Sequence, residues 1–183
     1  MTRNATSDVS FRVASALDAP CIGVLATQVF LDTYATDGIR PALAHEVLEH
    51  LSTDAISALL SCPATTFILA ELSGHLVGFV QLTKGSNQEL VVPGGGCELN
   101  RLYVQARFSG KGIGKALLHH AEDFAATQGA ETLWLTAWVG NHRALAFYQR
   151  QGYRDVGATM YIFQEEKHEN RVFTRTLNAR TAT

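Results

Sequence analysis

Apolar residues recur along the chain with two different spacings, which predict a succession of helices and strands. Helical spacing predicts two helices early in the chain, over about residues 17–34 and 42–60. In the first of these the apolar positions are Leu17, Cys21, Val24, Leu25 and Val29. A third helix is predicted from the glycine-rich stretch near residue 110 to about residue 127, with a buried face of Ile113, Leu117, Ala121, Phe124 and Ala125.

Runs of branched and aromatic residues predict about seven strands. They cover residues 9–14, 65–72, 75–82, 97–104, 132–139, 153–163 and 171–177, the last two joined by a charged turn over 164–170. A short helix follows Asn141 and ends near Gly152, where glycine favours a helix C-terminus. The predicted order is β-α-α-β-β-β-α-β-α-β-β. This order predicts an α/β fold (an α+β mixed sheet), in which a central twisted sheet is flanked by helices.

Composition narrows the class of protein. The chain has 183 residues, 46% hydrophobic and 17% charged, which predicts one domain over residues 1–183. Fifteen basic residues against 17 acidic ones give a net charge of −2, so no nucleic-acid partner is expected. Three widely spaced cysteines predict reduced thiols. With no signal-peptide pattern and no membrane-length apolar run, we expect a cytoplasmic protein without a membrane partner.

The stretch "SGKGIGKALL", residues 109–118, places three glycines just before a predicted helix. Such turns often bind phosphate, because the free amides and the dipole of the helix N-terminus point at an anion. The dinucleotide fingerprint is excluded, since Lys115 or Leu117 stands where its last glycine is required. The P-loop is excluded because Ala116 stands where it requires Ser or Thr. A plain connecting turn is the remaining alternative.

The residues around this stretch resemble a known motif. "LNRLYVQARFSGKGIGKALLHHAEDFA" is a strand, a short connection, glycines and an amphipathic helix. It resembles the acetyl-CoA-binding motif of the GCN5-related N-acetyltransferase (GNAT) superfamily, Gln/Arg-x-x-Gly-x-Gly/Ala. When the motif is aligned on Gly112 and Gly114, its Gln/Arg position falls on Ser109, which is a departure. Arg107 or Lys111 is a candidate for the missing positive charge.

A second stretch, "LWLTAWVGNHRALAFYQRQGYRDVG", is similar to the same superfamily. Asn141, Ala144 and Tyr148 are spaced so that they share one helix face. The resemblance implies that Asn141 hydrogen-bonds the pantetheine arm and that Tyr148 protonates the departing thiolate. The alternative for Tyr148 is a packing residue whose hydroxyl is satisfied.

The resemblance implies the GNAT fold, acetyl-CoA as acyl donor, and direct attack of an amine on the thioester. It places the pantetheine against the backbone near Leu102–Val104 and the pyrophosphate on the glycine turn. The cofactor-binding residues it implies are Leu102, Tyr103, Val104, Ser109, Gly110, Lys111, Gly112, Ile113, Gly114, Lys115, Asn141, Ala144 and Tyr148.

Deprotonation and recognition of the amine require further residues. An alkylamine has a pKa near 10, so attack needs a base or a water relay. Glu98 is the candidate base, on the strand where the family often carries a carboxylate; the alternatives are a surface glutamate or an ion pair with Arg101. Asp32 and Tyr34 are candidate acceptor contacts, and Trp138 is either a wall of the acceptor site or a packing residue. "HHAE" is not a zinc motif, and no metal is expected.

Three functions remain open. The favoured one is an N-acetyltransferase of a small-molecule primary amine, polyamine-like in charge. An acetyltransferase of protein N-terminal α-amino groups is the nearest alternative, and a non-catalytic acyl-CoA-binding or sensing module is the second. The presence of both Asn141 and Tyr148 favours an enzyme. A homodimer is common in the superfamily.

Overall fold

The computed structural model describes residues 9–91, 96–163 and 166–177. Its contacts divide the chain into two compact units. Unit 1 comprises the residues up to Gln81 together with Arg101–His120. Unit 2 comprises Leu82–Asn100 together with the residues from Ala121 onward. The expectation of one domain over residues 1–183 stays a prediction.

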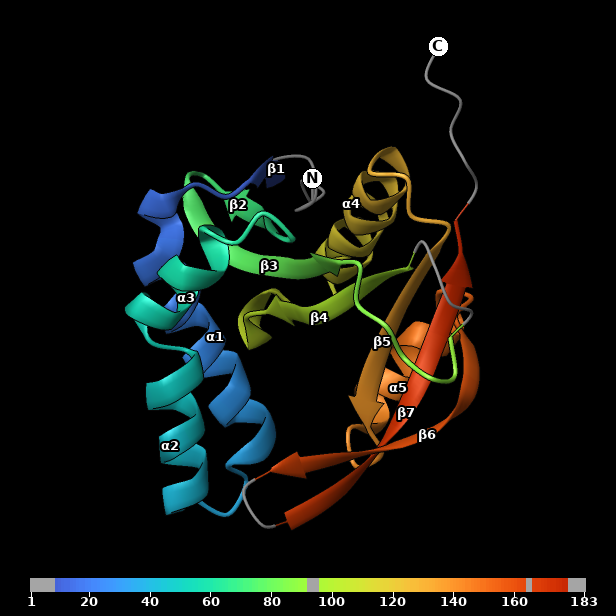
Figure 1. The fold of residues 1–183 in the computed structure, drawn as a ribbon. Coiled ribbons are helices and arrows are strands. Elements are labelled where there is room, and N and C mark those ends of the chain that lie inside the picture. The colour runs from blue at the N-terminus through green and yellow to red at the C-terminus, as the bar shows by residue number, and fades with distance from the viewer. Residues whose placement is uncertain (1–8, 92–95, 164–165, 178–183) are drawn as a thin grey trace, which may run out of the picture. The chain divides into compact units, whose positions relative to one another are not determined.

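Within the described residues, strands pair in the order β1-β2-β3-β4-β5-β7-β6, which confirms the predicted mixed sheet (Figure 1). The strands are β1 (Val9–Val13), β2 (Thr65–Leu72), β3 (His75–Lys84), β4 (Gly96–Val104), β5 (Thr132–Trp138), β6 (Arg154–Phe163) and β7 (Glu166–Thr176). The helices are α1 (Ala19–Tyr34), α2 (Pro41–His50), α3 (Thr53–Leu60), α4 (Ile113–Thr127) and α5 (His142–Arg150), with short 3-10 turns η1 (Ala16–Asp18) and η2 (Ala106–Phe108).

The core of unit 1 forms where α1 and α3 pack against the strands. β1 pairs antiparallel with β2, with Val9 opposite Leu72. The rings of Phe67 and Phe79 lie 5.8 Å apart at the centre of this core. Its buried residues are Ala19, Ile22, Leu25, Ala26, Leu51, Ile56, Phe67, Leu69 and Phe79.

The single helix predicted over residues 42–60 is wrong, because the chain forms two helices there, α2 and α3. The hydroxyl of Ser52 accepts a hydrogen bond from the amide of Ala55 at 3.2 Å and so caps the N-terminus of α3. The break brings the carbonyl of Leu51 against α1, where a Cβ on Gly23 would lie 2.7 Å from that oxygen. Three helices therefore separate β1 from β2.

Three of the five apolar positions that indicated the first helix are exposed in the structure. Leu17 is 90% exposed and Val24 is 72% exposed, and Cys21 is exposed as well. The residues that α1 buries are Ala19, Ile22, Gly23, Leu25 and Ala26. Gly23 and the two alanines allow close packing on this face, beside the larger buried side chains of Ile22 and Leu25.

The buried face predicted for the third helix is confirmed in α4. Ile113, Leu117, Ala121 and Ala125 are buried, and Phe124 is half-buried. The helix continues to Thr127, as the spacing predicts.

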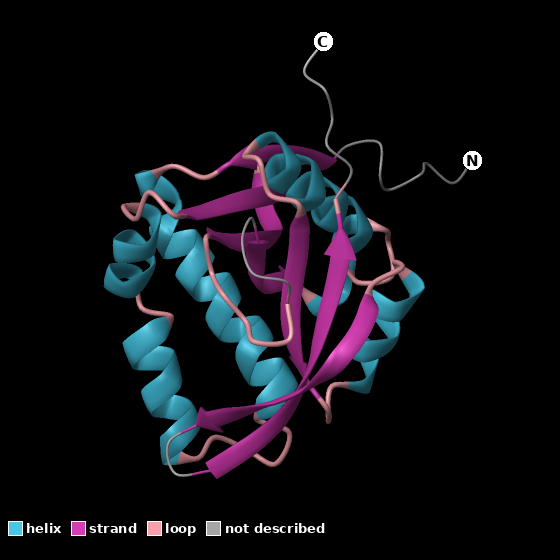
Figure 2. Cartoon of the chain, turned by 45° about the vertical axis from the view of Figure 1, so that its right-hand side comes forward, coloured by secondary structure: helices cyan, strands magenta, loops and turns pink. Residues whose placement is uncertain are grey.

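Unit 2 is built on antiparallel pairing of β7 with both β5 and β6. β5 pairs with β7 from Thr132–Thr176 to Trp138–Asn170. The last strand begins at Glu166, five residues before the predicted start at Arg171. The charged residues from Glu166 to Glu169, which suggested a turn, lie on β7 and pair with β6, so the two strands form a long hairpin (Figure 2). Residues 164–165 of the predicted turn lie outside the described residues.

Candidate active site

The glycine turn leads into α4 with the backbone conformation that glycine permits. Gly110 and Gly112 have φ of 76° and 82°, in the left-handed region that disfavours other residues. The helical hydrogen bond from the amide of Ala116 to the carbonyl of Gly112 is 3.0 Å long. The amides of the residues before Ala116 have no carbonyl four residues earlier within the helix, so they form an N-terminal donor set suited to an anion.

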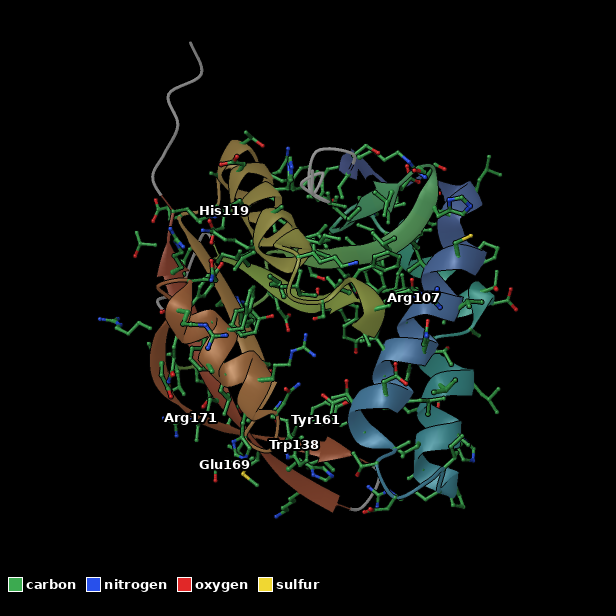
Figure 3. The ribbon with its side chains drawn as sticks, turned by 180° about the vertical axis from the view of Figure 1, so that it is seen from behind. Arg107, His119, Trp138, Tyr161, Glu169 and Arg171 are labelled. Carbon is green, nitrogen blue, oxygen red and sulfur yellow. The ribbon has the colours of Figure 1, made fainter. Side chains whose placement is uncertain are left out.

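Two cations flank the aromatic ring that precedes this turn. The guanidinium carbon of Arg107 lies 6.0 Å from the centroid of Phe108, and Nζ of Lys111 lies 5.2 Å from it. Arg107 lies on η2 (Figure 3). Ser109, in the Gln/Arg position of the motif, is half-buried and ends η2 with extended backbone. Positive charge is therefore carried on both sides of Ser109.

Gly110→Ala is expected to weaken acetyl-CoA binding by about tenfold, equivalent to about 1.4 kcal/mol. A methyl group has open space there, so the cost comes from the φ of 76°, which alanine relieves by shifting the turn. Gly129→Ala is the matched control, because Gly129 has φ of 82° and equally open space beyond the end of α4. Calorimetric titration measures both, and an equal loss of affinity in the control contradicts a phosphate-binding role.

The C-terminal end of β4 lies in unit 1, where its backbone closely approaches that of β3. A Cβ on Gly78 of β3 would lie 2.8 Å from the carbonyl of Tyr103. The amide of Gln105 donates to the carbonyl of Val77 at 3.0 Å. The half-buried backbone of Leu102–Val104, which the motif assigns to the pantetheine, is thereby fixed in place.

Glu98 is a half-buried carboxyl group on β4. Burial raises its pKa above the ordinary value, while hydrogen bonds from Ser86 and Asn100 partly oppose that shift. A raised pKa brings a carboxylate closer to the operating pH of a general base. Arg101, the alternative partner named from the sequence, donates from Nη1 to Oε1 of the buried Gln81.

The neighbouring Cys97 thiol is not an activated nucleophile. Burial raises its pKa to about 11, and the charge of Glu98 adds to the effect. A thiol with this pKa stays protonated near neutral pH, whereas the thiolate is the reactive form. This agrees with the direct attack that the motif implies.

The second motif begins with a helix cap. Oδ1 of Asn141 accepts a hydrogen bond from the amide of Ala144 at 3.1 Å and so caps α5. This leaves the amino end of the same side chain as a donor toward a ligand. The ring of Tyr148 is 7% exposed and packs against Tyr153 at 5.7 Å and Phe173 at 6.1 Å.

The acceptor-site candidates fall in both units. In unit 1, Asp32 is exposed in the last turn of α1, and the ring of Tyr34 lies 4.8 Å from that of Phe30. In unit 2, Trp138 ends β5 (Figure 3). Its ring meets that of His168 edge-on, with the centroids 6.4 Å apart. Its indole also covers Gly140, where a Cβ would lie 2.4 Å from the ring.

One cluster of polar residues in the structure was not predicted from the sequence. Glu122 of α4, Tyr153 before β6 and Arg175 of β7 meet in the interior of unit 2. No local pattern links three residues on three separate elements. The sequence signal available was a glutamate among the apolar residues of the buried face of α4.

The described residues also bear on metal binding and on membrane-spanning helices. In residues 9–91, 96–163 and 166–177, no group of three or more His, Cys, Asp or Glu side chains is arranged to hold a metal ion. None of the helices in that part of the chain is long and apolar enough to cross a membrane.

Comparison with known proteins identifies the class. The model of the acetyltransferase (GNAT) family matches residues 33–153, and the chain belongs to that family. An uncharacterized N-acetyltransferase of Lactobacillus delbrueckii subsp. lactis is 23% identical over 160 residues, 87% of this chain and 92% of that protein. A streptothricin acetyltransferase of Streptomyces lavendulae is 33% identical over 100 residues, 54% of this chain and 49% of that protein.

The fold is similar to that of the PaiA N-acetyltransferase from Thermoplasma acidophilum, solved in complex with coenzyme A. The TM-score is 0.74 at 20% identity, over 92% of this chain and 98% of that one. As a GNAT family member the protein is an acyltransferase, an N-acetyltransferase whose acyl donor is acetyl-CoA.

Proposed function

We propose that the protein acetylates a primary amine of a small, polyamine-like cation by direct attack on acetyl-CoA. The amine nitrogen attacks the thioester carbonyl carbon, forming the C–N bond while the C–S bond breaks. The proton lost by the amine passes to Glu98, directly or through water, and the proton of the Tyr148 hydroxyl passes to the departing sulfur. No covalent intermediate forms on the enzyme, and the raised pKa of Cys97 supports this feature.

The donor-side assignments follow the two motifs. The amides from Gly110 to Lys115 bind the pyrophosphate, with Ser109 beside them and with Arg107 or Lys111 supplying positive charge. The backbone of Leu102–Val104 pairs with the pantetheine arm. Within the described residues, β4 pairs with β5 only over Gly96–Glu98 against Thr132–Trp134. Because this ladder does not extend to Leu102–Val104, it supports the pairing of that backbone with the pantetheine arm.

The helix α5 supplies the remaining donor-side groups. The amino end of the Asn141 side chain donates to a pantetheine carbonyl, because its oxygen is already engaged in the helix cap. Ala144 allows the arm to approach the helix closely. Burial of the Tyr148 ring among other rings supports a fixed position for its hydroxyl.

The observation that carries the acceptor class is the exposed acidic end of α1. Asp32 lies in its last turn and Asp37 in the turn that follows, both exposed, with Tyr34 between them. The two exposed carboxylates make this end of α1 negative, which attracts a cationic amine, and an aromatic ring is a suitable contact for such a cation. We assign Asp32 and Tyr34 to recognition of the acceptor, and Trp138 to an apolar wall for its methylene chain.

An acceptor panel tests the proposal. Release of coenzyme A thiol is measured with polyamines, amino acids, aminoglycosides, streptothricin and peptides with free N-termini, and calorimetry first establishes that acetyl-CoA binds. We expect turnover with polyamines and weaker turnover with the peptides. Faster turnover of the peptides contradicts the small-cation assignment in favour of protein N-termini. Binding of acetyl-CoA without turnover of any amine would instead indicate a sensing module.

A further inference from the structure

A charged network lies in unit 2, formed by the buried Glu122 and Tyr153 and the half-buried Arg175. Glu122 is only 8% exposed. Its Oε1 accepts a hydrogen bond from the hydroxyl of Tyr153 at 3.0 Å and lies 3.2 Å from Nη1 of Arg175. The three side chains come from α4, from the turn before β6 and from β7, so the network ties three elements together.

The network also holds the C-terminal end of α5. Nη1 of Arg175 donates to the carbonyl of Gln151, the residue that follows α5, at 2.6 Å. The amide of Tyr153 donates to the carbonyl of Tyr148 at 3.0 Å. The rings of Tyr153 and Tyr148 meet edge to face, with centroids 5.7 Å apart. Tyr153 therefore touches Tyr148 through both its backbone and its ring.

Stability alone is a weak reason for such a network. Removing the Glu122 carboxylate from water costs on the order of several kcal/mol, and the side chain of its partner Arg175 is 35% exposed, so solvent screens their attraction. A satisfied polar cluster does, however, fix one geometry of the groups around it. Burial raises the pKa of Tyr153 far above its ordinary value, and the charge of Glu122 adds to this, so the hydroxyl stays protonated as a permanent donor.

We propose that Glu122, Tyr153 and Arg175 are positioning residues for Tyr148. They hold its ring and the last turn of α5 in the orientation from which its hydroxyl protonates the departing thiolate. The proposal rests on the role of Tyr148 as that acid. Because misplacement of a catalytic group by about 1 Å can cost on the order of 100-fold in rate, the network acts on kcat more than on binding of acetyl-CoA.

Tyr153→Phe tests the proposal, since it keeps the ring and removes the hydroxyl. We expect kcat to fall by about tenfold, with KM for acetyl-CoA within about twofold. The same substitution is then made in a Tyr148→Phe background. If Tyr153 acts through Tyr148, it causes no further loss there, because residues that act as one unit are not additive.

A variant of Glu122 and a matched control at a second glutamate complete the test. Glu122→Gln retains an acceptor for the Tyr153 hydroxyl but loses the charge that pairs with Arg175, and we expect it to lower kcat in the same direction. Its matched control is Glu131→Gln, which neutralises an exposed glutamate before β5 and is expected to leave kcat unchanged. If Tyr153→Phe does not fold, as judged by circular dichroism, Glu122→Gln carries the same double-mutant test.

The outcomes separate the two proposals. A Tyr153→Phe loss that is equal in both backgrounds, or an unchanged kcat in Tyr153→Phe and Glu122→Gln, overturns the positioning role while leaving Tyr148 as the acid. An unchanged kcat in Tyr148→Phe overturns the role of Tyr148 itself, and the positioning role with it. A rise in KM for acetyl-CoA at constant kcat assigns the network to cofactor binding and likewise overturns the proposal.

Discussion

Tyr148→Phe is expected to lower kcat on the order of 100-fold, the lower end of what a general acid contributes. The phenylalanine ring fills the same space against Tyr153 and Phe173, so the fold and the cofactor site are preserved. The departing thiolate then leaves without a proton donor. Steady-state kinetics with saturating acetyl-CoA measure kcat, and calorimetry should find the affinity for acetyl-CoA within about twofold of the parent.

A matched change on the same helix separates chemistry from packing. Phe147 is half-buried and its ring contacts that of Tyr148 at 5.2 Å. Phe147→Leu disturbs this packing without removing a hydroxyl, so we expect a much smaller loss of kcat. A comparable loss in both variants, or an unchanged rate in Tyr148→Phe, would refute the assignment of the hydroxyl as the acid.

Glu98→Gln is expected to lower kcat/KM for the amine about 100-fold near neutral pH, with the loss shrinking as the pH rises. Glu98 acts as a base only when deprotonated, and burial raises its pKa above the ordinary value of 4.5. Activity of the parent enzyme is therefore lost as the pH falls through that raised pKa. Above the pKa of the acceptor, the amine is already neutral and needs no base.

Acceptors of different basicity separate the base from the substrate. The pH profile of kcat/KM is measured with two amines whose pKa values differ by about 2 units. A limb of the pH profile whose pKa changes with the amine reports ionisation of the substrate. A limb whose pKa stays the same with both amines reports ionisation of a group on the enzyme. The fixed limb should disappear in Glu98→Gln and remain in Glu89→Gln, a neutralised exposed glutamate of the β3–β4 connection. A fixed limb that survives in Glu98→Gln assigns the base elsewhere.

The strands and the two motifs could be predicted because their signals are local. β2 forms over the eight residues that the pattern indicates. Asn141 caps α5, the short helix predicted to follow this asparagine. The break between α2 and α3 depends on the cap at Ser52, a single hydroxyl that a count of apolar residues overlooks. Periodicity alone merged the two helices for this reason.

The remaining differences arise from long-range packing. Leu17 and Val24 follow helical spacing yet are exposed, because tertiary packing buries the face of α1 that carries Ile22, Gly23 and Leu25. Glu122 and Tyr153 are 31 residues apart and meet only when α4 and the turn before β6 come together. The roles of the individual site residues, Tyr148 and Glu98 included, stay predictions until the variants are measured.

Both tryptophans of the chain lie on one strand, β5, in different surroundings. Trp134 is buried beside Val91 and Val172, and its Nε1 has no hydrogen-bond partner among the described residues. Trp138 is half-buried at the end of the strand, against His168. Indole emission shifts with local polarity, so the strand carries two intrinsic optical probes. A Trp138→Phe protein would fluoresce from the interior alone, and its difference from the parent spectrum would isolate events at the end of β5.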